Sequence, residues 1–102
     1  MSIQLGKYSF EGPYPKTDLL QDKSGVYAIL SWENNAYTVI DIGESATVKT
    51  RLDSHERFNC WERHCNGTIY YAVYYTPNMQ QAGRMEIEQE LRDKYNPICG
   101  ER

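Results

Sequence analysis

The sequence predicts an α/β (α+β) domain in which a small three-stranded sheet is flanked by helices, in the order β-β-α-α-β-α. Three observations predict this class. Two β-branched runs flank a short polar turn, a third run is rich in tyrosine, and a final amphipathic segment ends before a proline. The chain has 102 residues, which is enough for one compact domain with one core.

The first two predicted strands form a hairpin. Residues 1–24 show no sustained period and contain two prolines within a polar context, so we expect an irregular lead-in with at most one edge strand near residues 3–10. Residues 25–31 are almost continuously apolar and predict a strand buried on both faces. A polar turn follows, and residues 36–42 predict the second strand. We place the domain proper at residues 25–102.

Helices and one more strand complete the expected order. Residues 48–58 predict a helix capped by Ser45 or Thr47, and residues 59–65 predict a second short helix. Residues 68–76 are strongly β-prone and predict the third strand. The last helix is expected over residues 79–95, because Pro97 prevents its continuation.

The net charge of the chain limits the kinds of partner that it can bind tightly. The net charge is −3, whereas tight binding of nucleic acid depends on cations that neutralise phosphates. This balance argues against tight autonomous DNA binding, but it allows a local basic patch. The candidate patch residues for nucleic-acid binding are Lys49, Arg51, Arg57 and Arg63.

The cysteines and the apolar runs indicate the cellular setting. The three cysteines, Cys60, Cys65 and Cys99, cannot all pair within one chain. No run approaches the roughly 20 apolar residues that span a membrane, and the N-terminal residues show no signal-peptide pattern. We therefore expect a reduced, cytoplasmic protein without membrane partners. A zinc site that adds His64 is less favoured than buried thiols, because no CxxC motif is present.

The last predicted helix contains three glutamates, and helical spacing separates them. At roughly 100° per residue, Glu88 falls inside the apolar arc, whereas Glu86 and Glu90 fall on the solvated side. A carboxylate on the inner face needs a cation as partner. Two partners are possible: a metal ion, or a ladder with Arg84 and Arg92, which lie one helical turn away on either side.

These parts, in this order, resemble the GIY-YIG nuclease superfamily. The resemblance rests on Gly-Val-Tyr at 25–27, Asp-Ile-Gly at 41–43, Arg51 and His55 after the second motif, and Glu88 before Tyr-Asn-Pro at 95–97. It covers about residues 25–100. The order of the parts, rather than any single motif, makes the resemblance specific, and the family has the fold described above.

The resemblance implies an active site. It implies that Tyr27 helps to activate or orient the attacking water and that Arg51 contacts the scissile phosphate. His55, one helical turn beyond Arg51, would stand near the water or the phosphate, although a partly buried structural histidine is an equal alternative. The resemblance further implies that Glu88 is the ligand of a single divalent metal, Mg²⁺ or Mn²⁺.

Three positions depart from the family pattern. Asp41 stands where the second motif has its tyrosine, Glu44 stands where excision-repair members often have a lysine, and Gly100 stands where many members have an asparagine. Asp41 and Glu44 are possible accessory residues. Asp41 would either join the metal site or repel the phosphate.

The function that follows is hydrolysis of nucleic-acid phosphodiester bonds by a metal-dependent endonuclease of the DNA repair or processing type. The alternative is a nuclease-fold module that binds nucleic acid or a protein without cleavage. DNA is the expected partner, and a protein partner is a possible source of specificity. The sequence leaves the oligomeric state open.

Overall fold

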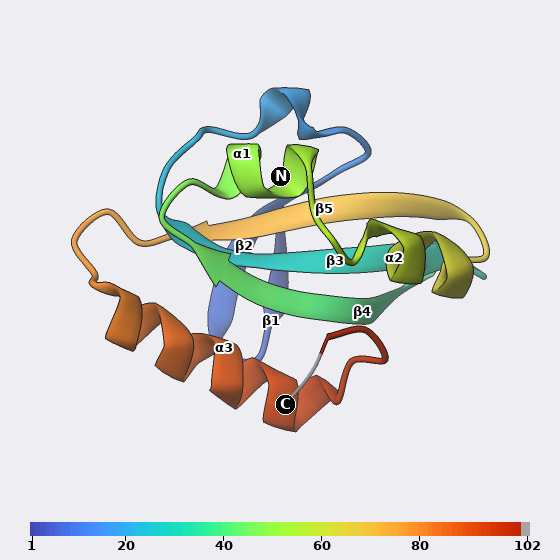
Figure 1. The fold of residues 1–102 in the computed structure, drawn as a ribbon. Coiled ribbons are helices and arrows are strands. Elements are labelled where there is room, and N and C mark those ends of the chain that lie inside the picture. The colour runs from blue at the N-terminus through green and yellow to red at the C-terminus, as the bar shows by residue number, and fades with distance from the viewer. Residues whose placement is uncertain (101–102) are drawn as a thin grey trace.

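The computed structural model describes residues 1–100, and Figure 1 shows its ribbon. One antiparallel sheet has five strands in the order β1-β2-β5-β3-β4. The strands are β1 (Ser2–Leu5), β2 (Tyr8–Tyr14), β3 (Gly25–Glu33), β4 (Ala36–Ser45) and β5 (Thr68–Tyr75). The helices are the short 3-10 helix η1 (Thr17–Leu19), α1 (Val48–Asp53), α2 (Phe58–His64) and α3 (Gln81–Tyr95).

From residue 25 onward, the structure confirms the predicted class and the order β-β-α-α-β-α. The three expected strands are β3, β4 and β5, and the last helix α3 ends before Pro97 as predicted. The final residues of the predicted domain, 101–102, lie outside the described part of the chain.

The sheet has two more strands than the sequence predicted. The lead-in forms β1 and β2, and β2 pairs with β5 rather than remaining irregular. The pairing of β2 with β5 shifts register between Glu11 and Tyr14, where Gly12 and Pro13 lie. A proline cannot donate to the ladder and is tolerated at such a bulge, which explains how a strand exists where the sequence suggests a break.

The helix predicted over residues 48–58 is shorter in the structure. The helix α1 ends at Asp53, and α2 begins only at Phe58. His55 therefore lies in the connection between two helices, not one helical turn beyond Arg51 on the same face. Its ring accepts a hydrogen bond at Nδ1 from the backbone N–H of Arg57, at 3.0 Å, and this bond satisfies a backbone group that the interrupted helix leaves free.

Helices cover both faces of the curled sheet. In Figure 1, α1, α2 and η1 lie over one face, and α3 lies along the other. Because elements pack over both faces of the sheet, the alternating side chains of β3 enter two cores, and the strand is buried on both faces as predicted. Tyr27 and Ile29 pack on the side of α1 and α2, whereas Val26, Ala28 and Leu30 pack on the side of α3.

Within residues 1–100, no helix combines the length and the apolar character needed to cross a membrane.

Candidate active site

The second sequence motif places a glycine beneath the tyrosine of the first. The antiparallel register of β3 and β4 pairs Tyr27 with Gly43. A Cβ atom built on Gly43 would overlap the phenol ring and hydroxyl of Tyr27. Only glycine leaves room for the ring in this position, so the two short motifs meet at one point of the sheet and fix the Tyr27 side chain.

The Tyr27 hydroxyl is hydrogen-bonded to the ring of His55. The distance from Oη to Nε2 is 2.7 Å, and the His55 side chain is fully buried. Burial, followed by the nearby charges of Arg51 and Arg57, lowers the pKa of His55 to about 4, so the ring is neutral at pH 7. Since Nδ1 accepts the Arg57 backbone N–H, the single ring proton is on Nε2. His55 therefore donates its hydrogen bond to Tyr27, and the phenol proton is free for another acceptor.

Tyr27 is a neutral phenol in this arrangement. Burial raises the pKa of Tyr27 to about 12, and the charges of Asp41 and then Glu88 contribute in the same direction. The charges of Arg57 and Arg51 act in the opposite direction. Positive charge near the hydroxyl would thus move Tyr27 toward its phenolate form, which the N–H of His55 would stabilise.

Arg51 projects from α1 toward the same hydroxyl. Its hydrogen bond with Glu56 raises the pKa of Arg51, and Tyr27 contributes to the increase. The guanidinium donates to both carboxylate oxygens of Glu56, at 2.6 and 2.8 Å. A planar guanidinium binds a phosphate with the same two-pronged geometry. Glu56 thus occupies the surface of Arg51 that a phosphate would use.

Glu88 faces the body of the protein, whereas Glu86 and Glu90 are exposed, as the helical spacing predicted. Its side chain is 25% exposed, and its Oε2 accepts a hydrogen bond from Nε of Arg92 at 3.1 Å. The other oxygen, Oε1, has no hydrogen-bond partner within residues 1–100. Half of the expected arginine ladder is present, because Arg84 instead donates to Glu44 at 2.9 Å.

The chemistry of Glu88 fits a divalent metal held by one protein carboxylate. Mg²⁺ prefers oxygen ligands, keeps several waters and commonly takes one or two carboxylates together with a substrate phosphate. The free Oε1 and the partial exposure of Glu88 suit this type of site. No cluster of three or more His, Cys, Asp or Glu side chains able to hold a metal occurs in the described chain. A metal here would depend on Glu88, water and substrate.

Asp41, considered above as a possible metal ligand, instead forms buried ion pairs. Its side chain is fully buried and is paired with two arginines, Arg57 at 2.7 Å and Arg92 at 2.7 Å. Nε1 of Trp61 and the backbone N–H of Ile42 also donate to this carboxylate. These donors occupy the lone pairs of Asp41, so it joins α2 to α3 around the edge of β4 rather than facing a metal or a phosphate.

Glu44, the other accessory candidate, is also engaged. Its carboxylate accepts hydrogen bonds from Arg84 at 2.9 Å and from Gln81 at 3.2 Å, and its side chain is only 13% exposed. Both partners lie on α3. Glu44 therefore attaches the beginning of that helix to β4, and the carboxylates of both acidic departures from the family pattern are engaged by arginines.

Gly100, the third departure from the family pattern, lies against Asp41, the first. Gly100 has φ of +93°, and a Cβ there would clash with the guanidinium of Arg92 and lie 2.9 Å from Oδ1 of Asp41. A side chain such as asparagine would displace this ion pair. Gly100 and Asp41 are thus two parts of one local arrangement.

The cysteines differ from the expectation of three free thiols. Cys60 of α2 and Cys99 form a disulfide with a Cα–Cα distance of 6.0 Å, and Cys65 is free. The pairing removes two of the ligands considered for zinc. It also removes the observation from which a reducing compartment was inferred, so the cytoplasmic location stays a prediction.

The predicted basic patch is largely neutralised. Lys49 pairs with Asp53 at 2.9 Å, Arg51 pairs with Glu56, and Arg57 is held by Asp41. Arg63 is exposed and makes no hydrogen bond or ion pair within residues 1–100. The electrostatic surface near Tyr27 therefore depends on whether these acidic partners stay in place.

Comparison with known proteins locates this arrangement within a known fold. No protein-family model matches the sequence, and a comparison with curated proteins finds no match. Among solved structures, the chain is similar to the GIY-YIG N-terminal endonuclease domain of UvrC from Thermotoga maritima, a point mutant bound to its catalytic divalent cation. The TM-score is 0.61, with 20% sequence identity over 84% of this chain and 91% of that domain.

The chain has the GIY-YIG fold. The match spans most of both chains. The structure brings Tyr27, His55 and Arg51 together, whereas Glu88 lies on α3 and is joined to the α2 side of the sheet through Arg92 and Asp41.

Proposed function

We propose that this domain is a divalent-metal-dependent endonuclease that hydrolyses phosphodiester bonds of nucleic acid. The observation that carries the proposal is the buried hydrogen bond between Tyr27 and His55, which lies beside Arg51 on a GIY-YIG fold. The similar UvrC domain is an endonuclease with a catalytic divalent cation. A buried tyrosine–histidine pair next to an arginine is a costly arrangement for packing alone, and it suits phosphoryl chemistry.

Tyr27 would orient the attacking water, and His55 would orient Tyr27. Because the Nε2–H of His55 occupies one lone pair of the phenol oxygen, the phenol proton points elsewhere and is available to water or to a phosphate oxygen. Loss of that proton would leave a phenolate stabilised by His55. His55 itself is not the base in this scheme, since Nε2 is protonated and Nδ1 is occupied.

Arg51 would bind the phosphate in place of Glu56. The guanidinium is charged at all physiological pH values and already has a carboxylate in the two-pronged geometry that a phosphate adopts. Charge that develops on the phosphate during hydrolysis would then be stabilised by a donor that is held in position.

Glu88 would hold Mg²⁺ or Mn²⁺ through its free Oε1. When bound, the metal would act as a Lewis acid on the phosphate and lower the pKa of water. Arg92 would fix the orientation of the Glu88 carboxylate through Oε2 while remaining paired with Asp41. The proposed ligand is thus supported by a buried ion-pair network.

The proposed substrate is DNA undergoing repair or processing, with selectivity for structure rather than sequence or with specificity supplied by a protein partner. The alternative function is binding of nucleic acid or protein without cleavage. The pairing of Arg51 with Glu56 and the net charge of −3 favour that alternative, because both weaken attraction for phosphates.

A cleavage assay tests the proposal. Branched, nicked and single-stranded DNA and RNA are incubated with the protein in Mg²⁺, Mn²⁺ or EDTA. Cleavage should require the metal, should disappear in Glu88→Gln and should persist in Glu86→Gln, an exposed glutamate on the same helix. Binding without cleavage in either metal would support the alternative. Cleavage by Glu88→Gln at the wild-type rate would contradict the metal assignment.

A further inference from the structure

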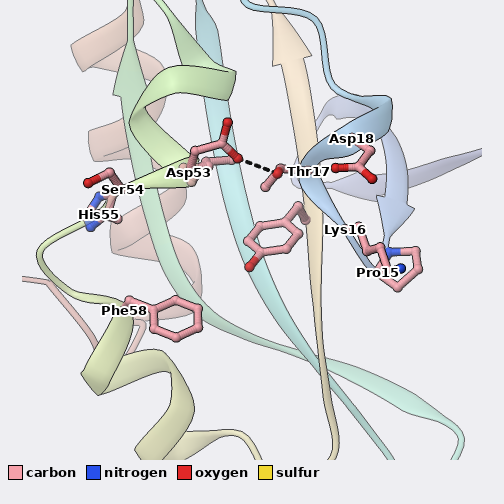
Figure 2. Close-up of a pocket in the computed structure, with 10 residues that line it drawn as sticks. Pro15, Lys16, Thr17, Asp18, Asp53, Ser54, His55 and Phe58 are labelled. Carbon is pink, nitrogen blue, oxygen red and sulfur yellow. Dashed lines mark hydrogen bonds between the residues drawn. The ribbon is translucent and has the colours of Figure 1, made fainter.

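A disulfide joins α2 to the segment that follows α3. Cys60 lies on α2, and Cys99 lies within residues 96–100, which form no helix or strand. Figure 2 shows the neighbourhood of the α2 end, where Phe58, the first residue of α2, and His55 line one hollow. Because Cys60 follows Phe58 closely on the same helix, the cross-link starts beside the part of the proposed site that contains His55.

The other end of the disulfide covers the Arg92 guanidinium with backbone. The carbonyl of Cys99 accepts a hydrogen bond from Nη1 of Arg92 at 3.3 Å, and the N–H of Cys99 donates to the carbonyl of Ile40 at 2.9 Å. A Cβ atom on Gly100 would clash with the same guanidinium. The Arg92 side chain is only 3% exposed. The segment that carries Cys99 is thus part of the wall that keeps this cation away from water.

Arg92 in turn orients Glu88, the proposed metal ligand. Each of its three nitrogens has its own acceptors. Nη1 donates to Cys99, and Nη2 donates to Asp41 at 2.7 Å and to the carbonyl of Ile42. Nε donates to Oε2 of Glu88 at 3.1 Å, and Oε1 has no partner within residues 1–100. Since Nη1 and Nη2 are engaged elsewhere, only one donor reaches the carboxylate, and the free Oε1 of the metal ligand depends on where Cys99 lies.

The disulfide opposes the release of this segment. Irregular segments with few backbone hydrogen bonds open locally at a much lower cost in free energy than a packed core. The bond between Cys60 and Cys99 ties residue 99 to a helix, so local opening requires that the bond be broken first. The state of two sulfur atoms therefore controls the surroundings of Arg92.

We propose that the Cys60–Cys99 disulfide is a redox switch for the metal site, an inference that rests on the proposed nuclease function. With the bond formed, Arg92 is held and Oε1 of Glu88 is open to a divalent metal. With the bond reduced, the Cys99 carbonyl leaves Nη1, and a buried donor without an acceptor is costly. The guanidinium then pairs with both oxygens of Glu88, in the two-pronged geometry that arginine and carboxylate prefer, and the open metal position is lost.

The chemical step is thiol–disulfide exchange with a dithiol. A thiolate of the dithiol attacks Sγ of Cys60, because Cys60 is half-buried whereas Cys99 is fully buried. The bond between the two sulfurs breaks, and Cys99 leaves as a thiolate that takes up a proton. The second thiol of the reagent then displaces Cys60. The protein gains two electrons and two protons, and the dithiol becomes a disulfide.

Calorimetric titration with Mn²⁺ of the oxidised and the reduced protein tests the switch. The reduced form is prepared with dithiothreitol and freed of the reagent by anaerobic gel filtration. The oxidised protein should bind Mn²⁺ at least about tenfold more tightly, since altering a residue that orients a metal ligand typically costs that much or more in affinity. Cys60→Ser should bind as weakly as the reduced wild type in either condition. Cys65→Ser is the matched control, because it removes the free cysteine and keeps the disulfide, and it should show the full difference.

A second measurement follows Arg92 without any metal. In nuclear magnetic resonance spectra, the Nε–H signal of Arg92 should shift on reduction, whereas the amide signals of the buried strand β3 should stay in place. An unchanged Arg92 signal would overturn the switch. Loss of the β3 signals would also overturn it, because reduction would then unfold the domain instead of releasing one segment.

The two measurements separate the switch from the proposed function. Equal, measurable Mn²⁺ affinities in the oxidised and reduced protein would overturn the switch and leave the metal site in place. Absence of Mn²⁺ binding in both states would overturn the metal site and the switch with it. Tighter binding by the oxidised protein, lost in Cys60→Ser and kept in Cys65→Ser, is the result that the proposal requires.

Discussion

The phenol ring of Tyr27 lies directly over Gly43, its cross-strand partner in the β3–β4 hairpin. This relationship gives a physical reason for the spacing of the two motifs. The strand pairing determines which residue lies beneath the ring, and the absence of a side chain there allows the hydroxyl to reach His55.

Gly43→Ala should displace Tyr27 and break its hydrogen bond to His55. We expect a loss of about 1 to 3 kcal/mol in the free energy of unfolding, as for other enlargements in a packed core, together with loss of cleavage. Denaturant unfolding measures the first effect. In a Tyr27→Ala background, the same substitution at Gly43 should have little further effect on stability, and an undiminished penalty there would contradict the proposed overlap.

Asp41→Asn should destabilise the fold strongly. The substitution removes the charge that neutralises Arg57 and Arg92, and Arg92 is almost fully buried. Breaking a buried ion pair in this way costs about 3 to 5 kcal/mol. Glu86→Gln, on the exposed face of α3, should change stability by less than about 0.5 kcal/mol. Equal melting temperatures for the two variants would show that Asp41 does not join the helices.

Glu56→Gln should tighten the binding of nucleic acid. The pKa of Glu56 is lowered to about 2, first by its hydrogen bond with Arg51, so the carboxylate competes with phosphate at every physiological pH. Glu62→Gln removes the same charge from an exposed residue of α2. Fluorescence anisotropy in EDTA should show a several-fold greater gain in affinity for Glu56→Gln than for Glu62→Gln. Equal gains would indicate that only net charge matters.

His55 should make stability depend on pH in the acid range. The unfolded chain protonates this residue near pH 6.5, whereas the folded chain does so only near pH 4, because burial opposes the charge. The unfolded state therefore binds more protons between these values, and stability falls as the pH decreases from about 6.5 to 4. The loss approaches about 3 kcal/mol at the acid limit. His55→Gln should lack this portion of the pH dependence, which urea unfolding at successive pH values would reveal.

The sequence was sufficient for the central sheet and the last helix, because their signals are local. The apolar run of β3 predicted burial on both faces, and helical spacing alone separated Glu88 from Glu86 and Glu90. The strand β2 was missed because Gly12 and Pro13 suggest a break, whereas the structure accommodates them at a register shift opposite β5. The pairing of β2 with β5 joins segments that are far apart in the sequence, so no local sequence pattern indicates it.

The surroundings of Asp41 could not be predicted for a related reason. Trp61 lies on α2, Arg57 immediately precedes that helix, and Arg92 lies on α3, which covers the opposite face of the sheet (Figure 1). The only signal in the sequence was that Asp41 replaces the tyrosine of the second motif. This replacement did not indicate whether the carboxylate would face a metal or a buried cation. The pairing of Cys60 with Cys99 could not be predicted either, because it depends on the path of the chain after α3. That segment returns to β4, where the backbone N–H of Cys99 donates a hydrogen bond to the carbonyl of Ile40.

The binding of Mn²⁺ to Glu88 is the most direct test of the account. Thermal melting of the wild-type protein, Glu88→Gln and Glu86→Gln is followed with and without Mn²⁺. Since a ligand that binds only the folded state stabilises it, Mn²⁺ should raise the melting temperature of the wild type and of Glu86→Gln. Glu88→Gln should be indifferent to Mn²⁺ and almost as stable as the wild type without metal, because Arg92 keeps Asp41 as its partner. A wild-type melting temperature that does not respond to Mn²⁺, or an equal response in Glu88→Gln, would contradict the metal site at the centre of the proposed function.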